Sequence, residues 1–512
     1  MQKMLDKLEK ASLNQLHFWI ILLGMLICVQ VQYIQHGAIS PDSVLYLEAA
    51  KLFSMGDWQA GFEIFNWPFY ALCIALVNKI SQLGVHSSAQ LLNIIFFGIA
   101  SYSFVAIVKL AGGKQKQVIA AALIWLSAQY MIGSVLEMLI RDEGFWAFFL
   151  LSIVFFIRFY QESQFKDALL WQLSIIVATL FRIEGILYLL FLPLSLLFQT
   201  ECNIKQKWGK LLTANVINIG LAMIILLIFA FNDGLSTKIL GRLNEVFTIN
   251  LWQQLTANLN EKSVIMSTQV LGKYLEEFAT IGLLLTLLFA IFAKTISTTG
   301  FIVVCLSAFG IKNNQRLFNH QSFQVLSAVA IIATISMGLI ITKVFVLSGR
   351  YVLAFSFILM VFAAFYFAEL LFQKTKNNKM HWLALLLVLF MFGGGLKNIL
   401  PKKQGHNFMQ EAVAWVIADN VNNKPVFYDQ ARMRYYAGAD FIGTFENLSY
   451  IQSMIDNNSI THHDYLLIES SKKDNKAKVL IESQLPDYQL IKQFNDAKAK
   501  KSVLIYLKQE MR

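Results

Sequence analysis

The stretch "RDEGFWAFFLLSIVFFIRFY" (141–160) begins with three charged residues and continues as an apolar run. A run of this length approaches the ~20 residues that an α-helix needs to cross about 30 Å of hydrocarbon. Runs of the same kind recur along the 512-residue chain, which is 56% hydrophobic and 15% charged. Because soluble domains carry about 25% charged residues, the composition predicts a polytopic α-helical membrane protein.

The net charge of +11 comes from lysines and arginines that are scattered among short loops. That distribution fits the tendency of cytoplasmic loops to carry positive charge, and it does not form the basic face of a nucleic-acid-binding protein. We therefore expect no nucleic-acid partner. The cysteines have no CxxC spacing and indicate neither a disulfide framework nor a zinc site; they are Cys28, Cys73, Cys202 and Cys305.

We expect about 11 spans in a lipid bilayer. Lysines before the first apolar run place the N-terminus in the cytoplasm, and the run lacks a small-residue cleavage site, so it is expected to remain as the first span. The segment 276–311 is ambiguous, and the other spans are predicted at 17–35, 88–110, 117–138, 144–160, 168–181, 186–199, 211–231, 323–346, 350–372 and 381–399.

For two apolar segments, 67–85 and 276–311, the length does not decide how often the chain crosses the membrane. If the lysine-rich turns at 109–116, 205–210 and 374–379 are cytoplasmic, parity makes 67–85 an interfacial helix rather than a crossing. By its length alone, 276–311 could form one span with a re-entrant piece or two spans, and the same parity requires an odd number of crossings there.

The composition changes after residue 400. "KPVFYD", "DYLLIES" and "KSVLIYLK" predict short strands, and "NFMQEAVAWVIADNV" predicts an amphipathic helix. We therefore expect a membrane domain over 1–402, with outer loops at 36–66 and 232–275. A small extracytoplasmic α/β domain is expected to follow over 403–512.

Charged residues at span ends form four groups. Ionisable groups at membrane depth cost roughly 2.5–3.5 kcal/mol each, so those retained there are candidates for function. With the lysine-rich turns inside, all four groups fall on the outer side. Each group alone could be a helix cap or a positional anchor, but their shared side favours one common site. The groups are Asp42, then Arg141 with Asp142 and Glu143, then Arg182 with Glu184, and finally Arg350.

The first outer loop contains "GAISPDSVLYLEAAKLFSMGDW" (37–58), in which Ser40 can cap a helix and Pro41 suits its first position. Asp42 then lies in the first turn, and Tyr46 lies one turn later on the same face. A first-turn Asp commonly does no more than support a helix start. A carboxylate there can also take a proton from an acceptor hydroxyl that attacks a sugar, while arginines stabilise a departing lipid phosphate.

These motifs resemble those of the GT-C-fold glycosyltransferases, which include protein O-mannosyltransferases and the transferases that add aminoarabinose to lipid A. "PDSVLYLEAA" resembles their first-loop acidic motif, and "NWPFYALCIAL" resembles their interfacial helix. "RDEGFWAFF" resembles their second acidic motif, and "FRIEG" resembles a "TRPEG"-like turn, with Ile183 where Pro is usual. "SGRYVLAFSFILM" resembles an Arg-Tyr that opens a late span. The pattern covers about 1–400, and the C-terminal part resembles the soluble domain of some members.

The resemblance implies that Asp42 is the general base and that Asp142 or Glu143 is a second acidic site, which holds the acceptor or a divalent cation. Arg182 and Arg350 would contact the polyprenyl phosphate. A Mg²⁺ or Mn²⁺ ion would have Asp42 and Asp142 as its candidate ligands, although the chain has Asp-Ser where Asp-Glu is frequent. The remaining predicted substrate-binding residues are Tyr46, Arg141, Glu184 and Tyr351.

The resulting prediction is an inner-membrane transferase that moves a sugar from a polyprenyl-phosphate donor to an extracytoplasmic lipid, glycan or protein acceptor. An O-antigen polymerase or ligase would concentrate its signature in one large late loop, and a transporter or flippase would show mid-span charges and related halves. A receptor or scaffold would leave the one-sided charges unexplained. In "FYDQARMRYYAGADF" (427–441), Arg432 and Arg434 could contact an anionic acceptor, but we expect a surface helix and loop instead.

Overall fold

The computed structural model describes residues 12–35, 37–221, 223, 251–372, 378–401, 405, 407–443 and 447–509. Contacts within the chain divide it into two compact units. The first, which we call the bundle, comprises 1–29, 91–136 and 141–399. The second, which we call the loop–sheet unit, comprises 30–90, 137–140 and 400–512. The predicted domain boundary after residue 402 falls outside the described residues.

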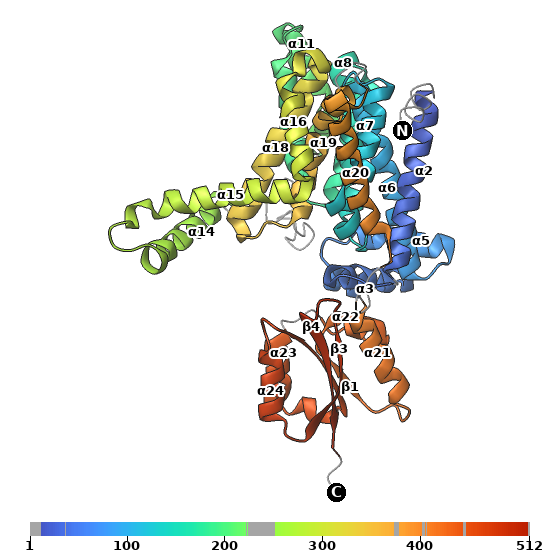
Figure 1. The fold of residues 1–512 in the computed structure, drawn as a ribbon, viewed down its shortest axis with the longest axis vertical. Helices are drawn as coiled ribbons and strands as arrows, with labels where there is room; N and C mark the ends of the chain where they lie inside the picture. Colours follow the sequence, from blue (N-terminus) through green and yellow to red (C-terminus); the bar gives the residue numbers. More distant parts are fainter. Residues whose placement is uncertain are drawn as a thin grey trace. The chain divides into compact units, whose positions relative to one another are not determined.

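Helices make up most of the bundle (Figure 1), and many of them are long and apolar. The bounds of its α-helices are α2 (Leu13–Ile34), α6 (Val85–Leu110), α7 (Gln115–Leu126), α8 (Asp142–Glu162), α9 (Phe165–Phe181), α10 (Gly185–Phe191), α11 (Ile204–Thr213), α14 (Leu251–Ile265), α15 (Ala279–Thr299), α16 (Phe301–Lys312), α17 (Asn314–Leu317), α18 (His320–Val344), α19 (Gly349–Phe372) and α20 (Asn378–Ile399). Within the described ranges, seven segments are long and apolar enough to cross a membrane: Leu13–Ile34, Val85–Leu110, Gln115–Val135, Asp142–Glu162, Glu276–Thr299, His320–Val344 and Gly349–Phe372. They support a multi-pass membrane protein.

Helix α19 forms the core of the bundle. It packs against α7, α15, α16, α18 and α20, and most of its side chains are buried. A helix that is apolar on every side is expected in such a buried position. The close approach of α16 depends on Gly310, because a Cβ atom there would overlap the carbonyl oxygen of Phe362 on α19.

The structure clarifies the two ambiguous segments. Helix α5 (Phe69–Ser81) has 13 residues, or about 20 Å of helix, which is too short to cross ~30 Å of hydrocarbon and suits an interfacial helix. The second segment forms α15 and α16, which are separated by Gly300 at a φ of +91°. The predicted span 211–231 and outer loop 232–275 lie partly outside the described residues, and the described part of that loop contains α14.

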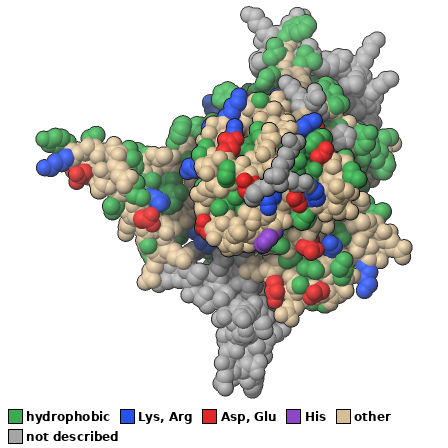
Figure 2. All heavy atoms as spheres, turned by 90° about the horizontal axis from the view of Figure 1, so that it is seen from below, with side chains coloured by type: hydrophobic (Ala, Val, Ile, Leu, Met, Phe, Trp, Pro, Cys, Tyr) green, Lys and Arg blue, Asp and Glu red, His purple; other side chains and the backbone are tan. Residues whose placement is uncertain are grey.

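Helices α14 and α15 form an arm that runs across the direction of α18 (Figure 1). Figure 2 shows patches of apolar side chains together with some charged ones on the arm at its left. On α15, the apolar side chains of Leu285, Leu288 and Phe289 are 60%, 62% and 68% exposed. Contiguous apolar area of this kind marks a surface that contacts lipid or another protein. If this helix pair contacts lipid, its apolar side chains are expected to be exposed on the surface of the protein.

The loop–sheet unit contains a four-stranded sheet in the order β1-β2-β4-β3. Its strands are β1 (Val426–Tyr428), β2 (Tyr465–Ser471), β3 (Tyr488–Asn495) and β4 (Lys501–Lys508), and its helices include α21 (Phe408–Asp419), α22 (Ala431–Ala437), α23 (Asn447–Asp456) and α24 (Lys476–Gln484). Strand β1 is parallel to β2, whereas β4 is antiparallel to both β2 and β3. The three predicted strands and the first helix are confirmed, but β3 was not predicted.

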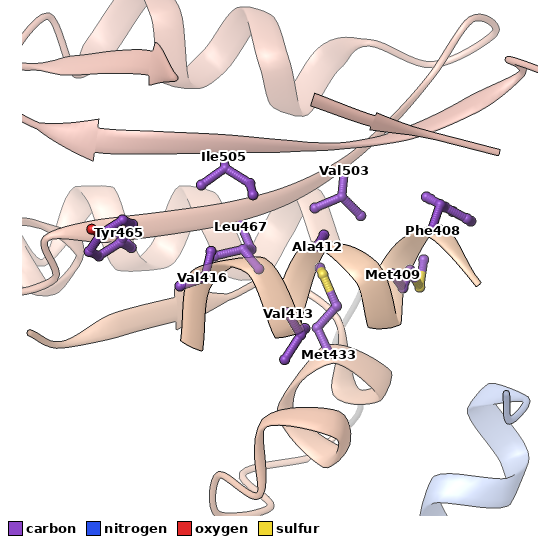
Figure 3. Packing of buried hydrophobic residues seen from close by; sticks show 10 residues of the cluster. All are labelled: Phe408, Met409, Ala412, Val413, Val416, Met433, Tyr465, Leu467, Val503 and Ile505. Carbon is purple, nitrogen blue, oxygen red and sulfur yellow. The ribbon is translucent and has the colours of Figure 1, made fainter. Parts of the chain in front are cut away.

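Helices cover both faces of this sheet. Because side chains alternate along a strand, Leu467 and Ile505 face α21, whereas Leu466 and Leu504 belong to the opposite core beneath α23 and α24. Figure 3 shows the first of these cores, in which Ala412 on α21 lies against the strands. Burial on both faces explains why β2 and β4 are continuous apolar runs in the sequence.

Candidate functional site

A charged cluster lies where α8 begins and α9 ends. The two helices pack together and are joined by a short turn in which Ser163 has a φ of +57°. Such a hairpin brings Asp142, the first residue of α8, beside Arg182, which caps the C-terminal end of α9. The Nη1 atom of Arg182 donates a hydrogen bond to Asp142 Oδ1. This contact joins two of the predicted site residues.

Arg182 is also held by its near neighbour Glu184. Its Nη2 atom lies 2.9 Å from Glu184 Oε1, and its Nε atom lies 3.3 Å from Oε2. Only 6% of the Arg182 side chain is exposed. Burying a guanidinium group is costly unless carboxylates and hydrogen bonds compensate it, so Asp142 and Glu184 stabilise Arg182 inside the protein.

The start of α19 completes the cluster. Arg350 Nη1 lies 3.7 Å from Asp142 Oδ2, and the guanidinium carbon of Arg182 lies 4.5 Å from the ring centre of Tyr351. The preceding Gly349 permits the close approach of the Tyr130 ring, because a Cβ atom there would lie 2.6 Å from Tyr130 Oη. Asp142 therefore faces two arginines, and Arg350 is the more accessible of them, with 26% of its side chain exposed.

Arg141 and Glu143 flank Asp142. Arg141 occupies the N-cap position of α8, whereas Glu143 is fully buried. Neither carboxyl oxygen of Glu143 has a hydrogen-bond partner among the described residues. The sequence identified Glu143 as part of an acidic motif, but it did not indicate that this carboxyl group is enclosed while Asp142 makes the contacts with arginine.

The other predicted site residues, Asp42 and Tyr46, lie in the loop–sheet unit. Helix α3 (Pro41–Met55) begins as predicted, because Ser40 Oγ accepts a hydrogen bond from the Ser43 amide at 3.2 Å. Asp42 is half-buried in its first turn. Tyr46 is buried and makes edge-to-face contacts with aromatic rings, at 5.1 Å from Phe65 and 5.3 Å from Tyr70. That Asp42 joins the other charges in one site stays a prediction.

The α/β domain holds the segment that leads into α3. Tyr436 Oη on α22 accepts a hydrogen bond from the Ile39 amide at 2.8 Å, and Tyr435 Oη lies 3.2 Å from His86 Nδ1. Helices α22 and α3 also pack against each other. Ile39 is three residues before Asp42, so these tyrosines fix the start of the helix that carries the predicted base.

Replacing Tyr436 with phenylalanine is expected to loosen this attachment. The change removes one hydrogen bond, worth about 0.5–1.5 kcal/mol, and leaves the Ile39 amide without its phenolic acceptor. Hydrogen exchange at residues 37–50 should accelerate. Tyr465→Phe is the matched control, since Tyr465 Oη donates instead to Asp419 Oδ2 at 2.8 Å. Equal exchange at 37–50 in the two variants would contradict the proposed attachment.

The segment 427–441 is more deeply buried than predicted. Arg434 is only 5% exposed and donates to the carbonyl oxygens of Tyr428 at 2.6 Å and Gly443 at 3.1 Å. Asp429 accepts a hydrogen bond from the Glu469 amide at 2.8 Å, and burial raises the pKa of its carboxyl group to about 8. The predicted helix is present as α22, but the prediction that Arg434 lies on the surface is wrong. The contacts of Arg434 connect β1 to the loop that follows α22.

The predicted divalent cation stays a prediction. Both oxygens of Asp142 lie against guanidinium groups, which compete with a metal for the same lone pairs. No group of three or more His, Cys, Asp or Glu side chains suited to a metal occurs in the part of the chain that the structure describes. Asp42, the other candidate ligand, lies in the loop–sheet unit, and the chemistry that we propose for this protein uses only groups of the chain itself.

Comparison with solved structures identifies the fold. ArnT from Cupriavidus metallidurans bound to undecaprenyl phosphate is similar with a TM-score of 0.51 at 12% identity, over 95% of this chain and 98% of ArnT. The Archaeoglobus fulgidus oligosaccharyltransferase in complex with Zn and sulfate gives a TM-score of 0.53 at 13% identity, over 96% of this chain and 73% of that one. AglB from the same organism, in complex with an inhibitory peptide and a dolichol-phosphate, gives a TM-score of 0.52 at 13% identity, over 95% of this chain and 74% of AglB.

These likenesses show that the chain has the GT-C fold, as the span-end motifs predict. No protein-family model matches the sequence, and no curated protein matches it.

Proposed function

We propose that this protein is a membrane glycosyltransferase that moves a sugar from a polyprenyl-phosphate donor to a lipid, glycan or protein acceptor on the extracytoplasmic side of a cell inner membrane. The fold supports the proposal, because similar structures include one bound to undecaprenyl phosphate and one in complex with a dolichol-phosphate. The observation that carries it is the cluster of Asp142, Arg182 and Arg350 at one end of an apolar bundle.

Arg350 is the residue that we assign to the donor phosphate. Its guanidinium group lies beside Asp142 but remains partly exposed, so it can donate further hydrogen bonds to phosphate oxygens. The phosphate gains negative charge as the sugar leaves, and a positioned cation stabilises that charge more in the transition state than in the bound donor.

Arg182 has a different role in this proposal. Asp142, Glu184 and the ring of Tyr351 already surround its guanidinium group, so it is a positioning residue rather than the main phosphate contact. It holds Asp142 in place, and Asp142 in turn orients Arg350. Rigid support of this kind keeps the phosphate-binding group within the narrow range of geometries that catalysis requires.

Asp42 is proposed as the general base. The acceptor hydroxyl oxygen forms a bond to the anomeric carbon, while the bond from that carbon to the donor phosphate oxygen breaks. The electron pair of the broken bond stays with the polyprenyl phosphate, and the hydroxyl proton passes to the Asp42 carboxylate. The proposal assigns an active chemical role only to groups that the chain itself supplies.

The direct test supplies purified protein with polyprenyl-phosphate sugars and candidate acceptors in lipid nanodiscs. Free polyprenyl phosphate and glycosylated acceptor should appear in equal amounts, and mass spectrometry can measure both. Movement of intact donor between leaflets without cleavage would instead identify a flippase and overturn the proposal.

Replacing Arg350 with alanine is expected to lower kcat/KM for the donor by about 10- to 100-fold, with a smaller effect on kcat/KM for the acceptor. The expectation follows from the loss of hydrogen bonds to a charged group, worth about 1.5–3 kcal/mol. Arg158→Ala is the control, because Arg158 is also partly exposed and pairs with Asp167 at 3.3 Å, near the turn that joins α8 to α9. If steady-state kinetics show a larger change in kcat/KM for the acceptor than for the donor, Arg350 is not the residue that contacts the donor phosphate.

A further inference from the structure

A cavity with charged lining residues lies in the bundle, at the ends of α7, α16 and α19. Its volume is about 610 Å³. Lys116 comes from the first turn of α7, Arg316 from α17 and Glu369 from the last turns of α19. The remaining lining residues are Gln117, Asn313, Tyr366, Ala368, Leu370 and Phe372. None of them belongs to the charged cluster around Asp142.

This cavity and that cluster lie at opposite ends of the same helix. Arg350 is the second residue of α19, and Phe372 is the last. At 1.5 Å per residue the two are separated by about 33 Å, which is close to the ~30 Å thickness of the hydrocarbon core. If Arg350 lies at one membrane surface, the cavity lies at the other.

The charges around the cavity favour an anion. Lys116 Nζ lies 5.5 Å from the ring centre of Phe372, and Arg316 pairs with Glu369. Two cations and one carboxylate leave a net charge of +1, which a singly charged phosphodiester would neutralise. Lys114 at the N-cap of α7 and Lys312 at the end of α16 are close in sequence to the lining residues Lys116 and Asn313, and they add further positive charge. Such an excess of lysine marks the cytoplasmic side, where the leaflet is rich in anionic lipids.

The aromatic wall of the cavity suits a ligand that also has an apolar part. The ring of Tyr366 stacks on Phe309 with their centres 5.1 Å apart, and Phe309 is 49% exposed on the outside of α16. A headgroup phosphate beside Lys116 and Arg316 can therefore have acyl chains that follow the apolar helix surface. We propose that this cavity binds the phosphodiester headgroup of an anionic phospholipid.

The test is retention of lipid by the purified full-length protein. Native mass spectrometry after reconstitution with equal amounts of phosphatidylglycerol and phosphatidylcholine should show retained phosphatidylglycerol. Lys116→Gln combined with Arg316→Gln is expected to reduce that retention at least about 10-fold, since charge-assisted hydrogen bonds to phosphate are worth about 1.5–3 kcal/mol each. The charge-retaining pair Lys116→Arg and Arg316→Lys should keep most of it.

A matched control removes the same charge elsewhere on the bundle. Lys205→Gln with Lys207→Gln alters α11 outside the cavity lining and should leave retention unchanged. Equal retention by the cavity variant and the wild type, or no preference for phosphatidylglycerol, would overturn the proposal. So would displacement of the bound lipid by inorganic phosphate at equal concentration, which would identify free phosphate as the ligand. Thermal unfolding of each variant confirms that it is folded.

Discussion

Replacing Asp42 with asparagine is expected to reduce sugar transfer by about 10²- to 10⁴-fold, the usual contribution of a positioned general base. The amide has nearly the same shape as the carboxylate but cannot accept the acceptor's proton. Helix α3 should still form, because Ser40 and Ser43 supply its capping hydrogen bonds and Pro41 its first residue. The loss of a first-turn charge costs about 0.3–1 kcal/mol in helix stability.

The measurement is turnover of a polyprenyl-phosphate sugar by purified variants with matched thermal unfolding. Asp57→Asn is the control, because Asp57 is also an acidic residue at a helix start and its Oδ1 accepts a hydrogen bond from the Ala60 amide at 3.1 Å. An asparagine can still accept that bond, so activity should be retained. If Asp42→Asn turns over at the wild-type rate, Asp42 has no part in the proton transfer.

Replacing Arg182 with methionine is expected to destabilise the bundle by about 3–5 kcal/mol, the usual cost of removing one partner from a buried ion pair. Asp142 would remain in the interior with Arg350 Nη1 at 3.7 Å from its Oδ2 atom, and Glu184 would lose both of its hydrogen bonds to the guanidinium group. Thermal unfolding in detergent without anionic lipid should show the loss directly.

Two further variants test whether the loss of stability is specific to Arg182 or follows the removal of any arginine. Arg316→Met removes an exposed partner of Glu369, for which surface pairs predict a change of about 0–1 kcal/mol. The combination of Arg182→Met, Asp142→Asn and Glu184→Gln removes the uncompensated charges and should recover much of the stability without restoring transfer. An Arg182→Met protein that unfolds at the wild-type temperature would show that Arg182 does not organise the cluster.

The sequence predicts the membrane character and the candidate charges because both depend on local patterns. A run of apolar residues identifies a span, and charges at its end identify a possible site. The contact between Arg182 and Asp142 also follows from a simple rule, since a helical hairpin brings its two free ends together. The sequence does not indicate how these charges pair: only the folded structure shows that Glu184 pairs with Arg182 and that the Arg350 side chain is 26% exposed.

Strand β3 shows a second limit of local patterns. It lies at the edge of the sheet, and most of its side chains are exposed, so "YQLIKQFN" lacks the apolar alternation that identifies β2 and β4. Arg434 shows the opposite problem, because its burial depends on carbonyl oxygens that the chain brings to it from Tyr428 and Gly443. The periodicity of apolar residues along the sequence therefore predicts neither strand β3 nor the burial of Arg434.

The hydrogen bond between Ile39 and Tyr436 has a consequence for biosynthesis, because it joins residues 397 positions apart. During translation, the first loop would emerge from the inserted chain long before its partner exists. A ribosome that stops after α20 would leave a set of inserted helices whose N-terminal loop lacks its anchor. Activity is therefore expected to arise only when the last part of the chain has been made and has folded, so that truncated products are inert.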